Sequence, residues 1–175
     1  SVETYMFSRQ TTSAEKYTII MDNPSDTIKA TSDSATATSD NTEFLASLQP
    51  DAFDAVIVAG GDFPTHPVPL AVMERALMLV ACDSAGEELV RRGYKPTAIV
   101  GDCDSMSAEF RAKHADIIYK VEEQDYNDLT KATRFCTERG CRRIAYVGAT
   151  GKREDHTLGN ISLLDFYRRE LHVDA

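Results

Sequence analysis

The sequence predicts an α/β fold, with a mostly parallel β-sheet covered by helices on both faces. Short apolar runs alternate with helical patterns from residue 54 onward, as expected for strand–helix–strand units. The apolar runs lack polar alternation, which is typical of strands buried on both faces. Charged residues and glycines follow the runs directly, so they should gather at the carboxyl edge of the sheet, where open α/β folds bind ligands.

Five apolar runs are expected to form the strands. Residues 55–59 run into two glycines, residues 78–82 into an aspartate, and residues 98–100 into a Gly-Asp pair. Residues 117–119 lead to an acidic cluster, and residues 144–147 end at a glycine. The crossovers between these parallel strands should be right-handed.

Helical patterns lie between these runs. They cover residues 69–77, 84–92, 107–113, 127–139 and 156–170. Within the fourth, Leu129, Ala132, Phe135 and Cys136 share one face, so that this face should pack on the sheet.

Residues 1–50 differ from the rest and are interpreted as an N-terminal extension without an assigned function. Residues 17–21 favour one strand, whereas residues 31–43, TSDSATATSDNTE, are nearly all small and polar. Such a segment buries too little apolar surface to offset its ordering entropy, so a linker or loop is expected. Residues 51–175 are expected to form one domain.

Composition excludes several classes of protein. The chain has 175 residues, 42% of them hydrophobic, and a net charge of −9, which argues against a general nucleic-acid binder. No apolar run approaches the roughly 20 residues of a membrane helix. The four cysteines form no CxxC pair. We expect Cys82 to be a core residue and the protein to lie in the reducing cytoplasm.

The segment GDCDS at 101–105 places two carboxylates, Asp102 and Asp104, in a turn after a strand. Both can reach one hard cation such as Mg²⁺, which binds through one or two carboxylates plus water and phosphate oxygens. The alternative is structural, with Asp104 or Ser105 capping the next helix. Asp83 follows the preceding strand and has the same two interpretations, a site carboxylate or an N-cap.

The acidic segment at 123–131 leads into a helix expected to start near Asn127. Asp128 and Lys131 are three residues apart, so they share a helical face. A capped helix with a surface ion pair is one interpretation. The other is a metal or substrate carboxylate beside a phosphate-binding lysine.

The segment GATGKREDHTLGN at 148–160 is glycine-rich and basic, but it does not match the Walker A pattern. Its glycines allow close backbone approach to an anion, and Arg153 can bind a phosphate with two parallel hydrogen bonds. Asp155 and His156 lie where the next helix starts, so either residue could instead cap it.

Together these segments resemble the thiamine pyrophosphokinase family. The matching segments are DSA at 83–85, GDCDS at 101–105, QDYNDLTKA at 124–132 and GATGKREDHTLGN at 148–160. The resemblance extends over roughly residues 54–171 and implies a Rossmann-like three-layer α/β/α catalytic domain.

The resemblance also implies an activity: diphosphate is transferred from ATP to thiamine with Mg²⁺, giving thiamine diphosphate and AMP. The implied magnesium cluster comprises Asp83, Asp102, Asp104 and Asp128. The implied ATP and phosphate contacts are Asp83, Lys131 and Arg153, and the implied thiamine contacts are Gln124 and Asp155. The implied catalytic residues are Asp102, Asp128, Arg153 and Asp155, with Asp128 or Asp155 as the proton acceptor.

The family's C-terminal β-sandwich is expected to be absent from this chain, because no run of alternating strands follows the last helix. The resemblance implies that the full-length protein is a homodimer, with ATP and thiamine as its partners and neither nucleic acid nor membrane. Two alternatives remain open: a metal-dependent phosphohydrolase and a non-catalytic nucleotide-binding fragment.

Overall fold

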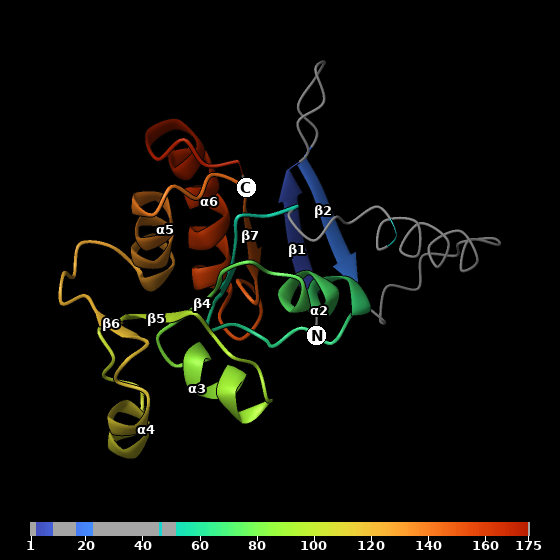
Figure 1. Ribbon diagram of the computed structural model, residues 1–175. Helices are drawn as coiled ribbons and strands as arrows, with labels where there is room; N and C mark the ends of the chain where they lie inside the picture. Colours follow the sequence, from blue (N-terminus) through green and yellow to red (C-terminus); the bar gives the residue numbers. More distant parts are fainter. Residues whose placement is uncertain (1–2, 9–16, 23–45, 47–51, 175) are drawn as a thin grey trace.

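The computed structural model describes residues 3–8, 17–22, 46 and 52–174 (Figure 1). The strands are β1 (Glu3–Ser8), β2 (Tyr17–Asp22), β3 (Ala55–Val58), β4 (Leu79–Cys82), β5 (Ala98–Gly101), β6 (Ile118–Lys120) and β7 (Ile144–Val147). The helices are α2 (Pro67–Glu74), α3 (Ala85–Arg91), α4 (Ala108–Lys113), α5 (Asp128–Glu138) and α6 (Glu154–Glu170).

The seven strands form one sheet in the order β2-β1-β7-β3-β4-β5-β6. The five strands from β7 to β6 are parallel, whereas β1 pairs antiparallel with both β7 and β2. The parallel register places Val58 of β3 beside Val147 of β7 and Ala81 of β4. A mostly parallel sheet was predicted, and the structure confirms it.

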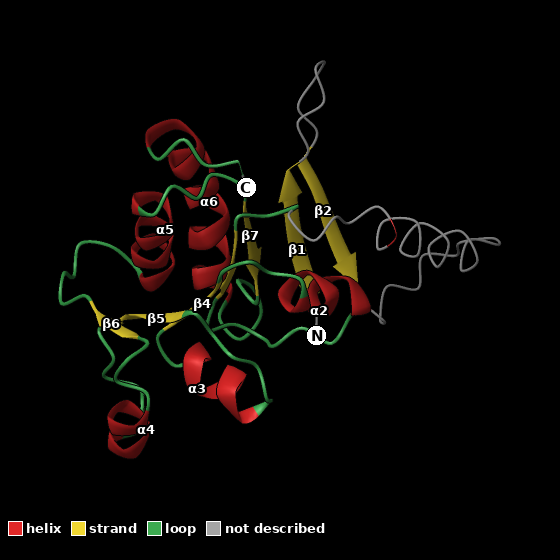
Figure 2. Cartoon of the chain, viewed as in Figure 1, coloured by secondary structure: helices red, strands yellow, loops and turns green. Residues whose placement is uncertain are grey.

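Helices cover both faces of the sheet and give three layers (Figure 2). Because side chains alternate along a strand, Val56 and Val58 of β3 join the core beneath α2, α3 and α4. Ala55 and Ile57 join the opposite core, beneath α5 and α6. Strands β3, β4, β5 and β7 are buried at every position, which explains their unbroken apolar sequence.

Side-chain caps set the start of three helices. The Asn127 side chain accepts a hydrogen bond from the backbone N–H of Thr130 at 2.9 Å, so α5 begins at Asp128 as predicted. Ser107 caps α4 in the same way, accepting from Phe110. The capping alternative for Asp104 and Ser105 is therefore not found.

Most element predictions agree with the structure within one or two residues. The predicted strand at 17–21 corresponds to β2, but β1 was not predicted. The polar segment 31–43 lies outside the described residues.

Cys82 is a buried core residue, as expected, and all four cysteines are buried free thiols. In the described part of the chain, no helix combines the length and apolar character that crossing a bilayer requires.

Candidate active site at the carboxyl edge of the sheet

A hollow of about 320 Å³ opens at the carboxyl edge of the parallel sheet. We call it the first hollow. The loops after β3, β4 and β7 and the first turns of α5 and α6 line it. Its lining residues are Ala59, Gly60, Gly61, Cys82, Asp83, Ser84, Asn127, Asp128, Leu129, Ala149, Gly151, Lys152, Arg153, His156 and Asn160. Three of the residues predicted from sequence therefore meet here: Asp83, Asp128 and Arg153.

Asp83 lies immediately after β4 and is only 9% exposed. Its backbone adopts a positive φ of 39°, which is uncommon for a residue with a side chain. The Ser105 hydroxyl donates a hydrogen bond to Oδ2, whereas Oδ1 is buried and has no hydrogen-bond partner. Gly101 on β5 makes room for this carboxylate, because a Cβ there would lie 2.8 Å from the Asp83 Cβ.

The turn after β5 brings Asp102 next to the end of β4. Cys103 has a φ of 65°, and its buried thiol lies 3.5 Å from the Gly101 carbonyl oxygen. Asp102 accepts a hydrogen bond from the Asp104 backbone N–H at 3.2 Å, and Arg111 donates to the Cys103 carbonyl at 2.9 Å. These two hydrogen bonds stabilise the turn that follows β5.

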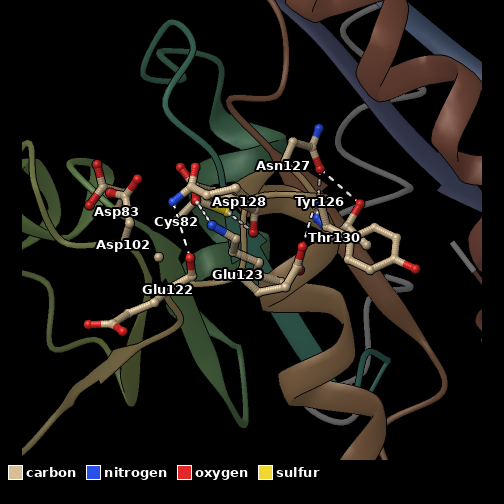
Figure 3. Close-up of polar contacts among 12 residues, drawn as sticks. Cys82, Asp83, Asp102, Glu122, Glu123, Tyr126, Asn127, Asp128 and Thr130 are labelled. Carbon is tan, nitrogen blue, oxygen red and sulfur yellow. Dashed lines mark hydrogen bonds and ion pairs between the residues drawn. The ribbon is translucent and has the colours of Figure 1, made fainter.

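Asp128 begins α5, lines the first hollow and is half-buried. Partial burial raises the pKa of Asp128, and the negative charges of Asp83 and Asp102 raise it further. The positive charge of Lys131 lowers this pKa, but the net change is an increase. Lys131 is buried, and its Nζ lies 3.5 Å from Asp128 Oδ1. Figure 3 shows Asp83, Asp102 and Asp128 as neighbouring side chains from three elements.

The loop after β7 packs against the loop after β3. The Gly61 backbone N–H donates to the Gly148 carbonyl at 2.8 Å, and Lys152 Nζ donates to the Gly60 carbonyl at 3.0 Å. The approach is so close that a Cβ at Gly61 would lie 2.2 Å from the Thr150 carbonyl oxygen. Glycine is therefore required at this position.

Arg153 and Asp155 form an ion pair at the start of α6, and both side chains are more than 60% exposed. The hydrogen bonds from Arg153 lower the pKa of Asp155. No side chain caps α6, so the capping alternative for Asp155 and His156 is not found. His156 instead lines the first hollow.

The remaining predicted site residues do not line the first hollow. Lys131 lies beneath Asp128, and Asp102 lies beside Asp83. Asp104 is exposed on its turn. Gln124 is exposed and donates to the Glu122 carbonyl of its own loop at 3.2 Å. Asp83 and Asp102 thus follow the ends of β4 and β5, and Asp128 lies at the start of α5, whereas Asp104 and Gln124 are exposed on their loops.

Asn160 has a structural role that was not predicted. From α6 its side-chain amide donates to the Ala149 carbonyl at 2.8 Å, and its oxygen accepts from Asn127 at 3.2 Å. One side chain thus connects the loop after β7 to the cap of α5. The only sequence signal was its position at the end of the glycine-rich segment.

The residues at this edge fit a magnesium ion. The buried, unpartnered Oδ1 of Asp83 is an oxygen that lacks a cation or donor. Among the described residues, no three His, Cys, Asp or Glu side chains are close enough to form a complete metal site. Mg²⁺ needs fewer, because it binds through one or two carboxylates together with phosphate oxygens and water.

Comparison with known proteins identifies the family. A family model described as "Thiamin pyrophosphokinase, catalytic domain" matches residues 70–173. The chain belongs to the thiamin pyrophosphokinase family. That match begins after β3 and includes every site residue predicted from sequence.

Two curated relatives and one solved structure are similar to this chain. Thiamine pyrophosphokinase 3 of Oryza sativa subsp. japonica is 36% identical over 88 residues, which is 45% of this chain and 33% of the rice protein. Thiamine pyrophosphokinase of Bacillus subtilis (strain 168) is 33% identical over 113 residues, which is 62% of this chain and 52% of that protein. The crystal structure of thiamin pyrophosphokinase from Geobacillus thermodenitrificans superposes with a TM-score of 0.53 at 30% identity, covering 65% of this chain and 54% of that one. The chain thus spans between a third and about half of the length of these relatives.

Proposed function

We propose that this chain transfers diphosphate from ATP to thiamine, producing thiamine diphosphate and AMP. The observation that supports the proposal most strongly is that Asp83, Asp128 and Arg153, from three separate segments, line one hollow at the carboxyl edge. A carboxylate can help to hold the magnesium ion of a bound triphosphate, and a guanidinium can bind its phosphate oxygens. Membership of the thiamin pyrophosphokinase family supplies the two substrates.

In the proposed reaction the hydroxyl oxygen of thiamine forms a bond to the β-phosphorus of ATP. The bond from that phosphorus to the oxygen bridging the α-phosphorus breaks, and AMP leaves with the bonding electrons. The hydroxyl proton passes to a carboxylate. Such transfers depend mainly on positioning and on neutralising charge, which is what the polar residues of the first hollow provide.

Asp83 and Asp102 would hold the magnesium ion, with Asp104 on the same turn as Asp102. When bound, magnesium neutralises charge on the phosphate oxygens. Arg153 lies at the start of α6, where the helix dipole also favours an anion. Lys131 stays beneath Asp128 and fixes the orientation of that carboxylate by their ion pair.

Asp128 is the better-placed proton acceptor. It lines the first hollow, whereas Asp155 is exposed and bound by Arg153. We therefore assign the proton to Asp128 and keep Asp155, with Gln124, as a thiamine contact. A homodimer that completes the thiamine site and a cytoplasmic location are proposed on the basis of the family.

Product analysis tests the function. The 175-residue chain is incubated with ATP, MgCl₂ and thiamine, and the products are identified by mass spectrometry. Thiamine diphosphate and AMP in equal amounts are expected. Release of phosphate or AMP without thiamine diphosphate would instead indicate a phosphohydrolase, and nucleotide binding without any product would indicate a binding module.

A matched pair of variants links the product to the site. Asp102→Asn should abolish thiamine diphosphate formation. Asp116→Asn removes the same charge from an exposed residue that precedes β6, at the opposite edge of the sheet, so it should leave product formation unchanged. Equal activity in the two variants would exclude Asp102 from the reaction.

A further inference from the structure

Lys152 is an exposed residue of the glycine-rich loop after β7 and lines the first hollow. Its backbone has a φ of 50°, in the left-handed region that a residue with a Cβ adopts only at an energetic cost. In this conformation the side chain reaches the loop after β3, where Nζ donates to the Gly60 carbonyl at 3.0 Å. Backbone strain of this kind is concentrated at functional sites, which makes Lys152 a candidate for a direct role in ligand binding.

The cations of the site differ in whether a carboxylate neutralises them. Arg153 forms an ion pair with Asp155, and Lys131 forms one with Asp128. Within the part of the chain that the structure describes, Lys152 has no carboxylate partner, and its ammonium donates to a neutral backbone carbonyl instead. The positive charge of Lys152 is therefore the one at this site that is open to an anionic ligand without a competing ion pair among the described residues.

Two groups of opposite charge with unused binding capacity thus line the first hollow. One is Asp83, whose buried Oδ1 has no hydrogen-bond partner. The other is the Lys152 ammonium. An ammonium group has three N–H donors, and the Gly60 carbonyl takes one of them, so the others stay available to a ligand. A divalent cation bound to phosphate oxygens is complementary to this pair, because the carboxylate attracts the cation and the ammonium attracts the oxygens.

We propose that Lys152 binds a phosphate oxygen of the magnesium-bound phosphate donor and ties the loops after β3 and β7 together around that ligand. This inference rests on the proposed function, which places the triphosphate in the first hollow. Lys152 adds a phosphate-binding residue to Arg153, whose guanidinium also donates to Asp155. Because lysine acts on phosphate as a point charge, the contribution of Lys152 to binding should depend on its charge rather than on its backbone conformation.

Three substitutions of Lys152 separate the charge from the backbone strain. Lys152→Met keeps the strain and removes the charge, Lys152→Gly removes both, and Lys152→Arg keeps both. The matched control is Lys95→Met, because Lys95 is exposed and precedes β5, at the opposite edge of the sheet. Binding of MgATP and of magnesium tripolyphosphate to the 175-residue chain is measured by calorimetry at low and high salt. Circular dichroism gives the melting temperature of each variant.

We expect Lys152→Met and Lys152→Gly to weaken the binding of both ligands at least about tenfold, the lower end of the effect of losing a hydrogen bond from a charged group. Lys152→Gly should nevertheless melt at a higher temperature than Lys152→Met, because glycine adopts a positive φ without strain. The affinity of both variants should depend less on salt than that of the unsubstituted chain, because a charge that salt screens is gone. Lys152→Arg should restore most of the affinity, and Lys95→Met should leave it unchanged.

The inference alone is overturned if Lys152→Gly binds both ligands as tightly as the unsubstituted chain, because the lysine would then have a structural role only. Unchanged salt dependence in Lys152→Met, or affinity in Lys152→Arg as low as in Lys152→Met, overturns it as well. Failure of the unsubstituted chain to bind MgATP overturns the proposed function and the inference with it.

Discussion

Replacing Asn160 with alanine should separate the loop after β7 from the start of α5. The Asn160 side chain forms two hydrogen bonds, to the Ala149 carbonyl at 2.8 Å and from Asn127 at 3.2 Å. A neutral hydrogen bond contributes about 0.5–1.5 kcal/mol net, so Asn160→Ala should lower the free energy of unfolding by about 1–3 kcal/mol. MgATP affinity should fall too, because Asn160 lines the first hollow.

The chain has no tryptophan and seven tyrosines, so urea unfolding is best followed by far-UV circular dichroism. Ser162→Ala is a matched control on the same helix, because the exposed Ser162 hydroxyl donates a local hydrogen bond to the Leu158 carbonyl one turn earlier, at 2.8 Å. This exposed local change should alter the free energy of unfolding by no more than about 0.5 kcal/mol.

A double-mutant cycle with Asn127→Ala isolates the bond between the two asparagines. Asn127→Ala also removes the cap of α5, which costs about 1 kcal/mol by itself. If the 3.2 Å bond between the side chains forms in solution, the two changes should couple by about 0.5–1.5 kcal/mol. Additivity of the two changes within about 0.3–0.5 kcal/mol would refute the reasoning.

Two further predictions concern stability. Gly61→Ala should destabilise the fold or displace the loop, because the new Cβ would lie 2.2 Å from the Thr150 carbonyl oxygen. The matched control is Gly159→Ala, whose Cβ would meet nothing within 4 Å. This control should stabilise α6 by about 0.5–1 kcal/mol, as measured by thermal unfolding. Burial alone raises the pKa of Asp54, but hydrogen bonds from the backbone N–H groups of Arg143 and Arg142 and from the Arg143 side chain outweigh burial and lower the pKa. Asp54→Asn should therefore destabilise the chain at pH 7. The difference from the unsubstituted chain should begin to shrink at about pH 3.9, the ordinary pKa of an aspartate, and should be lost only as pH falls through the lower pKa of the folded state; a pH-independent difference would contradict this.

The parallel strands could be predicted because each is buried on both faces, so that burial leaves an unbroken apolar run in the sequence. Strand β7 matches the predicted 144–147 at both ends. Residues 3–8 mix polar and apolar types, and β1 forms by pairing with β2 and β7. The pattern of polar and apolar residues within one segment does not predict pairing with strands that lie elsewhere in the sequence. Helix α2 starts at Pro67, two residues before the predicted start, with proline in its first turn.

The positions of Asp83 and Asp102 could be predicted because these residues follow strands whose carboxyl ends share one edge. The contacts that fix them could not, because they join residues far apart in sequence. Lys152 and Gly60 are 92 positions apart, and Asn127 and Asn160 are 33 apart. The positive φ of Asp83 has no signal in its own side chain, since it depends on the space that Gly101 leaves beside it.

We propose that the acids at the ends of β4 and β5 bind the nucleotide through a magnesium ion, and ATP binding to Asp102→Asn tests this proposal most directly. Asp102 accepts a hydrogen bond from the Asp104 backbone N–H at 3.2 Å. The side-chain oxygen of an asparagine can accept the same hydrogen bond, so the turn should persist in the variant. In MgCl₂ the variant should bind ATP at least about tenfold more weakly than the unsubstituted chain, equivalent to about 1.4 kcal/mol. In EDTA it should bind ATP as well or more tightly, because a negative charge that repels the phosphates is gone. Weakening by the same factor with and without magnesium would contradict the account.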